Sequence, residues 1–153
     1  MEYSTSFKEN AENVIKRNFE SDLLKERLNA KLGLKVLDCD EENHTWMDFL
    51  FEPEELHLNQ YDGIHGGITC SVLDACCGIA VWADKKTLPS TTDMSVSFIK
   101  PMPRGKYRIH VDLTSKGNRL AGGVGTIINM ETEEVCATGM MKYYVSNSIP
   151  IIH

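Results

Sequence analysis

A long apolar segment that carries a single formal charge constrains the fold of this chain more than any other feature. Residues 63–83 contain only one charged side chain, Asp74. A segment that is apolar on nearly every side is typical of a buried helix, and we predict a helix over residues 66–83. A carboxylate buried there without a partner would cost several kcal/mol, the order of magnitude of the penalty for ions in protein interiors. Asp74 is therefore expected to be paired or to take part in chemistry.

Length and composition indicate one globular domain. The chain has 153 residues, of which 42% are hydrophobic and 25% charged, as is ordinary for such domains. The polar breaks within residues 63–83 argue against a membrane span, and the polar first residues do not match a signal segment, so we expect a cytoplasmic location. The five cysteines lack zinc-ligand spacing. They are expected to be buried thiols in a reducing compartment, with no metal site.

The net charge of −6 argues against general nucleic-acid binding. The charge is uneven, however, because residues 100–119 carry six basic side chains and one acidic side chain. The basic residues are Lys100, Arg104, Lys106, Arg108, Lys116 and Arg119. They form either a docking site for an anionic ligand or the solvated ends of strands.

Hydrophobic periodicity divides the chain into an N-terminal helical segment (1–32), a domain of sheet and helix (33–146) and a C-terminal tail (147–153). Ser6 and Glu9 form a capping-box pattern, and Ser21–Asp22 is expected to cap a second, shorter helix. Since a helix that is apolar all round must be enclosed, we predict an α+β fold in which a six-stranded antiparallel sheet wraps around the helix at 66–83. The predicted strands are 34–39, 44–51, 91–100, 106–115, 119–129 and 134–144.

The sequence His65-Gly66-Gly67 at the start of this helix predicts a hydrogen-bond donor for a substrate. The first N–H groups of a helix lack intrahelical acceptors and carry partial positive charge, and glycines let a ligand approach the backbone. Such a site can stabilise a carbonyl oxygen that gains negative charge in a reaction. Asp74 follows Gly66 by eight residues, which is roughly 12 Å along a helix. A site that uses both groups would need two copies of the helix, so the spacing indicates a dimer with shared sites.

A longer pattern, Asn59-x5-His65-Gly66-Gly67-x6-Asp74, precedes a strand that ends in Lys100-Pro101. In this spacing the chain resembles the PaaI-like acyl-CoA thioesterases of the hotdog-fold superfamily, over residues 33–145. The resemblance implies hydrolysis of the thioester of an acyl- or aryl-acyl-CoA to free acid and CoA. It implies no cofactor, since coenzyme A is part of the substrate. It also implies a homodimer with one continuous sheet, often doubled to a tetramer.

The resemblance also implies roles for individual residues. Asp74 matches the catalytic carboxylate, acting as nucleophile or as general base on water, and the Gly66 N–H of the facing subunit matches the group that polarises the carbonyl. Asn59 matches the residue that orients the carbonyl or the water, and His65 matches a histidine that is more positional than catalytic. The family's Gly-Arg turn is altered here, to Lys116-Gly117-Asn118-Arg119. The predicted substrate-binding residues are Gly67, a hydroxyl from Thr91 or Thr92, and the basic residues Lys100, Arg104, Lys116 and Arg119.

Two other functions remain open at this point. A hotdog dehydratase or hydratase acting on 3-hydroxyacyl thioesters would pair His65 with Asp74 for proton transfer. A catalytically silent module would bind acyl-CoA without hydrolysing it. A serine hydrolase is excluded because no Gly-x-Ser-x-Gly motif is present. The candidates for lining an apolar or aromatic acyl pocket are Trp46, Met47, Trp82 and Met94.

Overall fold

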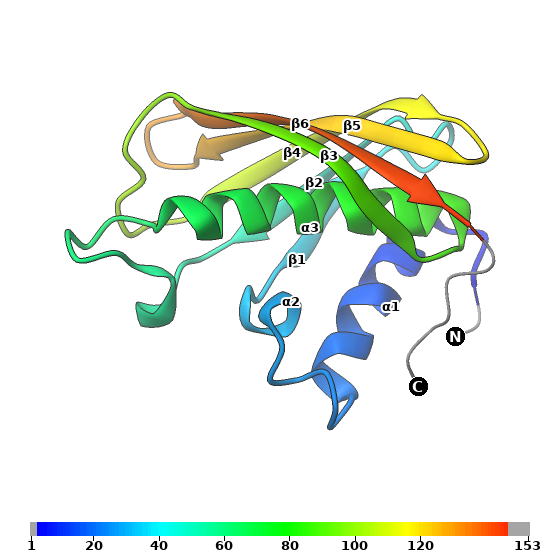
Figure 1. Ribbon diagram of the computed structural model, residues 1–153, viewed down its shortest axis with the longest axis horizontal. Helices are drawn as coiled ribbons and strands as arrows, with labels where there is room; N and C mark the ends of the chain where they lie inside the picture. Colours follow the sequence, from blue (N-terminus) through cyan, green and yellow to red (C-terminus); the bar gives the residue numbers. More distant parts are fainter. Residues whose placement is uncertain (1–2, 147–153) are drawn as a thin grey trace.

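The structure, a computed structural model that describes residues 3–146, consists of one antiparallel sheet curved over a long helix (Figure 1). The elements follow in the order α1 (Phe7–Glu20), α2 (Leu28–Lys31), β1 (Lys35–Cys39), β2 (Trp46–Phe51), a 3₁₀ turn (Glu55–His57), α3 (Gly66–Lys85), β3 (Pro89–Phe98), β4 (Tyr107–Lys116), β5 (Leu120–Asn129) and β6 (Val135–Val145). The six strands lie in the order β1-β2-β4-β5-β6-β3, and every neighbouring pair is antiparallel. The predicted α+β fold is confirmed, whereas the predicted tail (147–153) lies outside the described residues.

The strands bury alternate residues, as a sheet with one covered face requires. In β2, Met47, Phe49 and Phe51 are buried in the core, and the residues between them face the other side. Each predicted strand lies within two residues of the observed bounds, and the predicted helix at 66–83 continues to Lys85. Periodicity and turn residues together therefore located every strand of the sheet.

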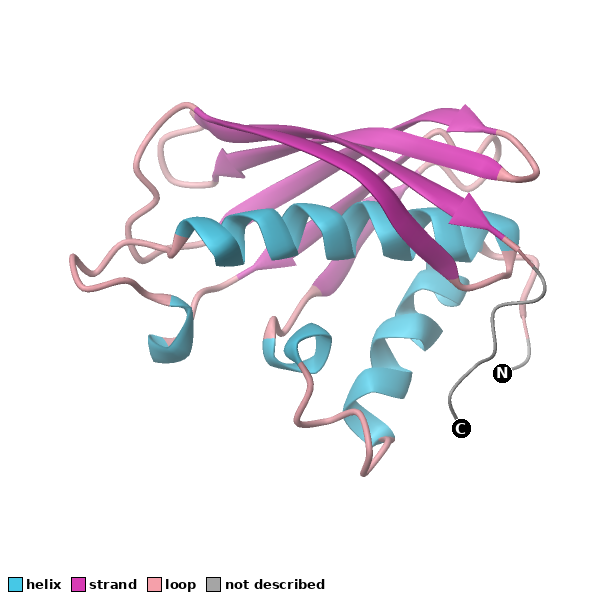
Figure 2. Ribbon diagram, in the orientation of Figure 1, coloured by secondary structure: helices cyan, strands magenta, loops and turns pink. Residues whose placement is uncertain are grey.

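The helix α3 lies under the concave face of the sheet (Figure 2), and half of its twenty residues are buried. Leu73 packs where Gly125 of β5 and Gly139 of β6 pair with each other. A Cβ at Gly125 would lie 2.7 Å from Leu73 Cδ2, and a Cβ at Gly139 would lie 3.2 Å from Leu73 Cδ1. The two missing side chains therefore let the helix approach the sheet closely.

By length and composition, α3 is the one helix within residues 3–146 that could cross a membrane. Its most apolar window of 18 residues is 56% buried inside the protein. The enclosed core helix of a globular domain passes the same test, so the hydropathy of α3 is weak evidence for a span.

The N-terminal helix α1 packs onto the same core. Phe7 and Val14 are buried, and Ser6 accepts the N–H of Glu9 at 3.1 Å, as the capping-box pattern predicts. The carboxylate of Glu41, in the turn after β1, accepts the N–H of Phe7 at 2.8 Å. The start of α1 is thereby tied to the sheet.

The prediction that Ser21–Asp22 caps a second helix is wrong. Residues 22–26 form turns, and α2 begins only at Leu28. Most of residues 21–29 are charged or exposed, so the segment has no apolar face whose burial would stabilise a longer helix.

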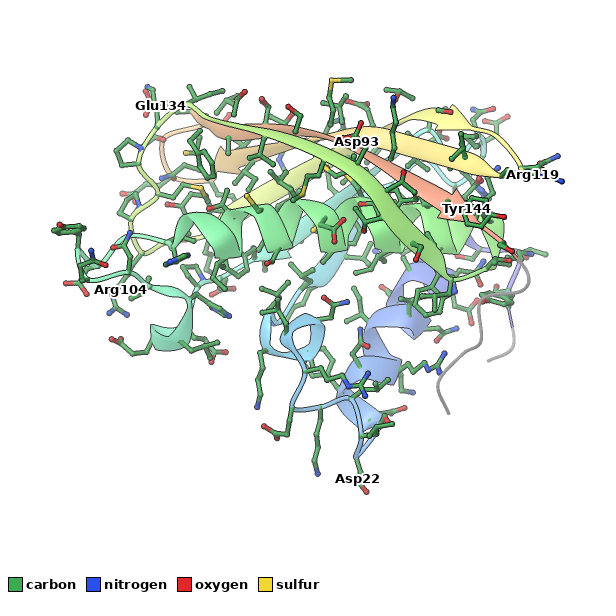
Figure 3. All side chains as sticks on the ribbon, in the orientation of Figure 1. Asp22, Asp93, Arg104, Arg119, Glu134 and Tyr144 are labelled. Atoms are coloured by element: carbon green, nitrogen blue, oxygen red, sulfur yellow. The ribbon has the colours of Figure 1, made fainter. Side chains whose placement is uncertain are left out.

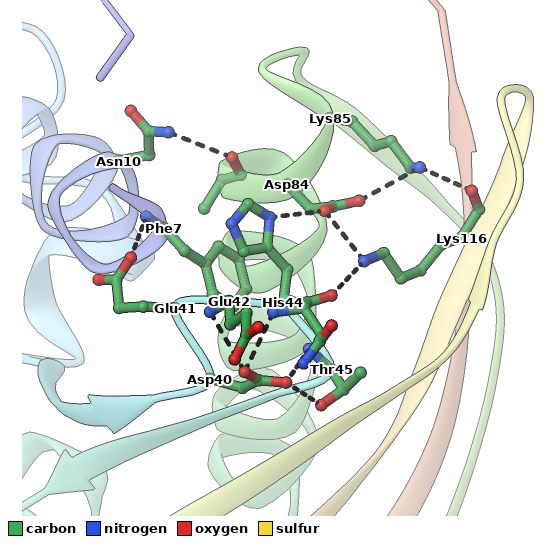
Figure 4. A network of polar contacts seen from close by, with 12 residues as sticks. Phe7, Asn10, Asp40, Glu41, Glu42, His44, Thr45, Asp84, Lys85 and Lys116 are labelled. Atoms are coloured by element: carbon green, nitrogen blue, oxygen red, sulfur yellow. Dashed lines mark hydrogen bonds and ion pairs between the residues drawn. The ribbon is translucent and has the colours of Figure 1, made fainter. Parts of the chain in front are cut away.

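At its C-terminal end, α3 is tied to other segments through Asp84 (Figure 4). The carboxylate pairs with His44 Nδ1 at 2.9 Å, Lys85 Nζ at 3.2 Å and Lys116 Nζ at 3.3 Å, and the side chain is only 9% exposed. The His44 ring stacks on Phe7 of α1, with ring centroids 4.4 Å apart. The cluster therefore joins α1, the turn before β2, α3 and the end of β4.

Candidate active site

Asp74 lies near the middle of α3 and is held from two strands. Thr91 Oγ1 of β3 donates to Asp74 Oδ1 at 2.9 Å, and the hydroxyl oxygen of Tyr143 on β6 lies 3.1 Å from the same carboxylate oxygen. The Tyr143 hydroxyl also lies 2.7 Å from the Asp74 backbone carbonyl. Within residues 3–146, the second carboxylate oxygen, Oδ2, has no partner. Asp74 is thus paired through one oxygen only, and its side chain is half-buried rather than enclosed.

Asp74 opens onto a pocket of about 160 Å³ between α3, the N-terminal helices and the start of β3. Trp82 and Leu88 give this pocket apolar walls. Asn18 of α1 and Asn29 of α2 add amide side chains, and neither amide hydrogen-bonds to a described residue. Since a cavity of about 150 Å³ holds a benzene molecule, the pocket suits a ring-sized or short group.

Only one of the four predicted pocket residues, Trp82, lines this pocket. Trp46 lies on the outer face of the sheet, stacked on His110 with ring centroids 5.8 Å apart, and Met47 is buried in the core. Met94 is 43% exposed on β3. Trp46 and Met47 do not line this pocket because neither face of β2 borders it, and Met94 lies farther along β3 than Thr91. That these three residues contact an acyl group stays a prediction.

The first turn of α3 leaves one backbone donor unused. His65 Nδ1 accepts the N–H of Gly67 at 2.9 Å, and the His65 carbonyl accepts the N–H groups of the next two residues at 2.9 and 3.0 Å. Among the first four residues of the helix, all of them described, only Gly66 has an N–H without an acceptor. Gly66 also lines a second pocket, of about 380 Å³. A free helical N–H at a pocket is a site for a partly negative oxygen.

Asn59 and His65 shape the loop that leads into α3. Asn59 Oδ1 accepts the N–H of Tyr61 at 2.9 Å and that of Gly63 at 3.2 Å. The Asn59 Nδ2 has no acceptor among the described residues. His65 is exposed, and its imidazole is the N-cap of α3. His65 thus fixes the start of α3, and the Asn59 amide hydrogens remain free to donate to a ligand.

A β-bulge distinguishes the two candidate hydroxyls on β3. The register of β3 against β6 shifts between Thr91 and Asp93. Thr91 donates to Asp74, whereas the Thr92 hydroxyl donates to the Lys142 carbonyl at 3.2 Å. Thr91 is therefore the hydroxyl that reaches the carboxylate.

The predicted basic cluster is divided between opposite ends of the molecule, as Arg104 and Arg119 show in Figure 3. Lys100 and Arg104 precede β4, whereas Arg119 follows it. The ten residues of β4 separate these groups by about 30 Å of extended chain. Three of the four predicted contacts are already paired, Lys100 with Glu134, Arg104 with Glu55, and Lys116 with Asp84. The guanidinium of Arg119 is exposed and has no partner within residues 3–146.

β3 forms an exposed edge of the sheet. It pairs only with β6, and eight of its ten residues are exposed. Met94 and Phe98 are apolar but 43% and 59% exposed. A long unpaired edge that carries exposed apolar side chains is typical of a surface that pairs with another chain.

Metal ligands and reactive thiols do not gather at this site in the part of the chain that the structure describes. No three His, Cys, Asp or Glu side chains within residues 3–146 are grouped so that they could hold a metal ion. All five cysteines are free, and burial raises the pKa of the Cys76 and Cys77 thiols, which are fully buried on α3. These thiols are packing residues, since a thiol needs a lowered pKa and access to be a nucleophile.

Tyr143 is the site residue that the sequence did not reveal. It is 69 residues from Asp74 in the chain and 2% exposed. Alternation along β6 buries Met141, Tyr143 and Val145, so the pattern could have shown that Tyr143 points inward. Which residue of α3 the Tyr143 side chain reaches depends on strand register, and the alternation of buried residues does not determine the register.

Comparison with known proteins agrees with this geometry. The family model described as the thioesterase superfamily matches residues 61–136, which include Gly66 and Asp74. Acyl-coenzyme A thioesterase 13 of Mus musculus is 25% identical over 96 residues, which cover 61% of this chain and 69% of that protein.

Solved structures share the fold. Zebrafish thioesterase superfamily member 2 has a TM-score of 0.76 at 17% identity, with 91% of this chain and 98% of that chain covered. The PaaI protein of the Escherichia coli phenylacetic acid degradation operon has a TM-score of 0.73 at 17% identity, with 93% and 97% covered. The chain therefore belongs to the thioesterase superfamily. Its fold is the hotdog fold, and the resemblance to the PaaI-like members that the sequence predicts is confirmed.

Proposed function

We propose that the protein is an acyl-CoA thioesterase that works as a homodimer, with Asp74 of one copy and the Gly66 N–H of the other copy in each site. One observation carries the proposal: Asp74 Oδ2 and the Gly66 N–H are both without partners among the described residues, and both residues line pockets. Membership of the thioesterase superfamily and the similarity to a mouse acyl-CoA thioesterase support this function.

The arrangement along β3 explains how a second copy would complete the site. Thr91 near the start of β3 bonds to Asp74, and the Phe98 ring at its end lies 3.6 Å from a Cβ built on Gly66. If two β3 strands pair antiparallel about their midpoints, Thr91 of one copy lies opposite Val96 of the other, two residues from Phe98. Asp74 then comes near the Gly66 turn of the other copy, whereas its own Gly66 is roughly 12 Å away along the helix. The pairing would also satisfy the free sheet edge.

The two groups have complementary tasks in thioester hydrolysis. The Gly66 N–H, at the positive end of its helix, binds the carbonyl oxygen, which becomes negative in the tetrahedral intermediate. Asp74 Oδ2 either attacks the carbonyl carbon or takes a proton from the water that attacks it. In both routes the C–S bond breaks, coenzyme A leaves as the thiol, and water supplies the oxygen and hydrogen that complete the acid. Thr91 keeps the carboxylate in place.

The pocket beside Asp74 would take the acyl group, and its size favours a ring or a short chain over a long chain. Lys100, Arg104, Lys116 and Arg119 remain the proposed contacts for the phosphates of coenzyme A. Their separation within one copy requires that both copies contribute or that only some of them bind. The chemistry requires no cofactor beyond the substrate, and a cytoplasmic location remains a prediction.

Asp74→Asn tests the proposal. Thiol release from benzoyl-CoA, hexanoyl-CoA and palmitoyl-CoA should fall by about 10²–10⁴-fold in kcat/KM, the usual contribution of a positioned acid or base. Light scattering should show the same oligomer as for the unmodified protein. Asp112→Asn removes the same charge from an exposed position on β4 and should keep full activity. Full activity of Asp74→Asn would refute the mechanism. Conversion of a 3-hydroxyacyl-CoA to the enoyl product without thiol release would favour a dehydratase.

A further inference from the structure

The hydroxyl of Tyr143 has one hydrogen and two acceptors on Asp74. Its oxygen lies 2.7 Å from the Asp74 backbone carbonyl oxygen and 3.1 Å from Oδ1 of the carboxylate. Burial raises the pKa of Tyr143 far above that of an ordinary phenol, and the nearby Cys77 and Asp74 raise it further. The hydroxyl therefore keeps its hydrogen at physiological pH and is always a donor.

The ring of Tyr143 is fixed by its surroundings. The residue is 2% exposed and pairs on one side with Thr91 of β3 and on the other with Ala121 of β5. A Cβ built on Gly78 of α3 would lie 3.4 Å from the ring and 3.7 Å from the hydroxyl oxygen, so the helix packs directly on this side chain. Because the ring cannot shift in such packing, only the hydroxyl hydrogen is left to rotate.

We propose that Tyr143 is a positioning residue for Asp74 and that its hydroxyl hydrogen turns from one acceptor to the other during the reaction. While Asp74 is negatively charged, the hydrogen points at Oδ1 and, together with Thr91, holds that oxygen so that Oδ2 is presented to the substrate. When Oδ2 takes up a proton or an acyl group, the carboxyl group loses its charge. The hydrogen then turns to the backbone carbonyl. This inference rests on the proposed function, and the only bonds that it adds are hydrogen bonds.

Few other titratable groups face Asp74. Within residues 3–146, the titratable groups that face it are Tyr143 of β6 and Cys77 of α3, whose thiol pKa is raised by burial and then by Asp74 itself. α1 and α2 contribute amide side chains to the pocket, and β3 contributes the hydroxyl of Thr91. In the proposed dimer, the turn with His65 of the partner subunit is added. Apart from the Tyr143 hydroxyl itself, none of these groups changes in Tyr143→Phe, so an altered pH dependence reports the lost hydroxyl.

The test compares Tyr143→Phe with Tyr144→Phe. The first variant removes the hydroxyl and keeps the buried ring, and the second removes a hydroxyl from the next residue, which faces outward and is 42% exposed. In Tyr143→Phe we expect kcat/KM to fall about three- to tenfold, mainly through kcat. The acid limb of its pH profile should move about 1–2 pH units higher, the size that one hydrogen bond to a charged group produces. Tyr144→Phe should change neither quantity.

A second measurement does not depend on catalysis. Titration of the Asp74 carboxyl carbon by ¹³C NMR, with the signal assigned through Asp74→Asn, should show a midpoint at higher pH in Tyr143→Phe than in the unmodified protein. An unmoved midpoint in a variant that melts as the unmodified protein does would overturn the inference. A moved midpoint in a protein that releases no thiol from any acyl-CoA would refute the proposed function and leave the role of Tyr143 standing.

Discussion

At its C-terminal end, α3 finishes in contacts with other residues of the same chain. Lys86 adopts a left-handed backbone with φ of 56° and donates its N–H to the Trp82 carbonyl at 2.7 Å. Asp84 pairs with the His44 ring and with two lysines. At its N-terminal end, His65 satisfies the N–H groups that follow Gly66, while the Gly66 N–H stays free beside a pocket. Because Gly66 is exposed and lines that pocket, its N–H is open to water or to a ligand, whereas the C-terminal end offers no such free donor.

After Asp74→Asn, the largest effect is expected at the N-terminal end of α3, from Gly66→Pro. Proline lacks the N–H but is favoured at the first helical position, and His65, with φ of −61° and ψ of 134°, already has the extended backbone that precedes a proline. We therefore expect kcat/KM for acyl-CoA hydrolysis to fall by about 10²–10³-fold, as for loss of one oxyanion donor. Thermal melting should show an intact fold.

The matched control is Gly66→Ala. It keeps the N–H and places a Cβ 3.6 Å from the Phe98 ring, which is an ordinary contact. Equal activity of the proline and alanine variants would exclude Gly66 as the donor.

Mixing two inactive variants tests whether the Gly66 N–H at the open end of α3 acts in the site of another subunit. When Asp74→Asn and Gly66→Pro are refolded together, activity should return to about a quarter of the unmodified value, since half of randomly paired two-fold dimers are mixed and each keeps one intact site. Activity measured on the mixture and on each variant alone decides the point. A mixture that stays inactive while mixed dimers form would place both groups in one subunit.

At the closed end, Asp84→Asn should affect stability rather than catalysis. Burial raises the pKa of Asp84, but the hydrogen bonds with His44 and Lys85 and the charge of Lys116 lower it more, so the pKa lies below its usual value. The contribution of Asp84 is therefore complete above the unfolded value of about 3.9 and is lost as pH falls through the folded pKa. At pH 7 the free energy of unfolding should drop by about 3 kcal/mol, with kcat unchanged.

Urea unfolding from pH 7 down to pH 3 measures this effect, and the difference between Asp84→Asn and the unmodified protein should shrink below about pH 4. Asp22→Asn is the control, because the Asp22 side chain is 97% exposed and, within residues 3–146, pairs only with Lys25. Its effect should stay within about 0.5 kcal/mol. A penalty for Asp84→Asn that is the same at every pH would contradict the electrostatic account.

The smallest effect is expected from His65→Ala, which removes the N-cap but leaves the Gly66 N–H in place. The free energy of unfolding should fall by about 1 kcal/mol, the usual cost of losing a cap, with at most a few-fold loss of activity. His65→Asn restores a capping oxygen and should recover most of the stability in the same urea experiment. A loss of activity as large as that of Asp74→Asn would instead make His65 a reacting group, as in the dehydratase hypothesis.

The features that the sequence predicted are those that depend on a few residues close together in the chain. The lone charge of Asp74 in an apolar run and the glycines after His65 are local, so they located the helix, its open end and the carboxylate. The choice between Thr91 and Thr92 was not predictable, because a bulge in β3 changes which of them points to α3.

Other features depend on distances that the sequence does not contain. Arg104 and Arg119 are close in sequence, but β4 runs between them and carries them to opposite ends of the molecule. Tyr143 reaches Asp74 only because β6 lies beside β3 in the sheet. Pairing of strands far apart in the chain decides such contacts, and periodicity records only which side of a strand is covered.

Leu73, the residue before Asp74, rests in the hollow that Gly125 and Gly139 leave in the sheet. An alanine at position 125 would force either Leu73 to repack or the helix to rise, and a raised helix would draw the acid away from the Thr91 hydroxyl. The position of the Asp74 carboxylate thus depends on two glycines of the sheet that do not line the pocket beside it. Substitutions at Gly125 or Gly139 would therefore change the distance from the Asp74 carboxylate to the Thr91 hydroxyl without replacing either polar group.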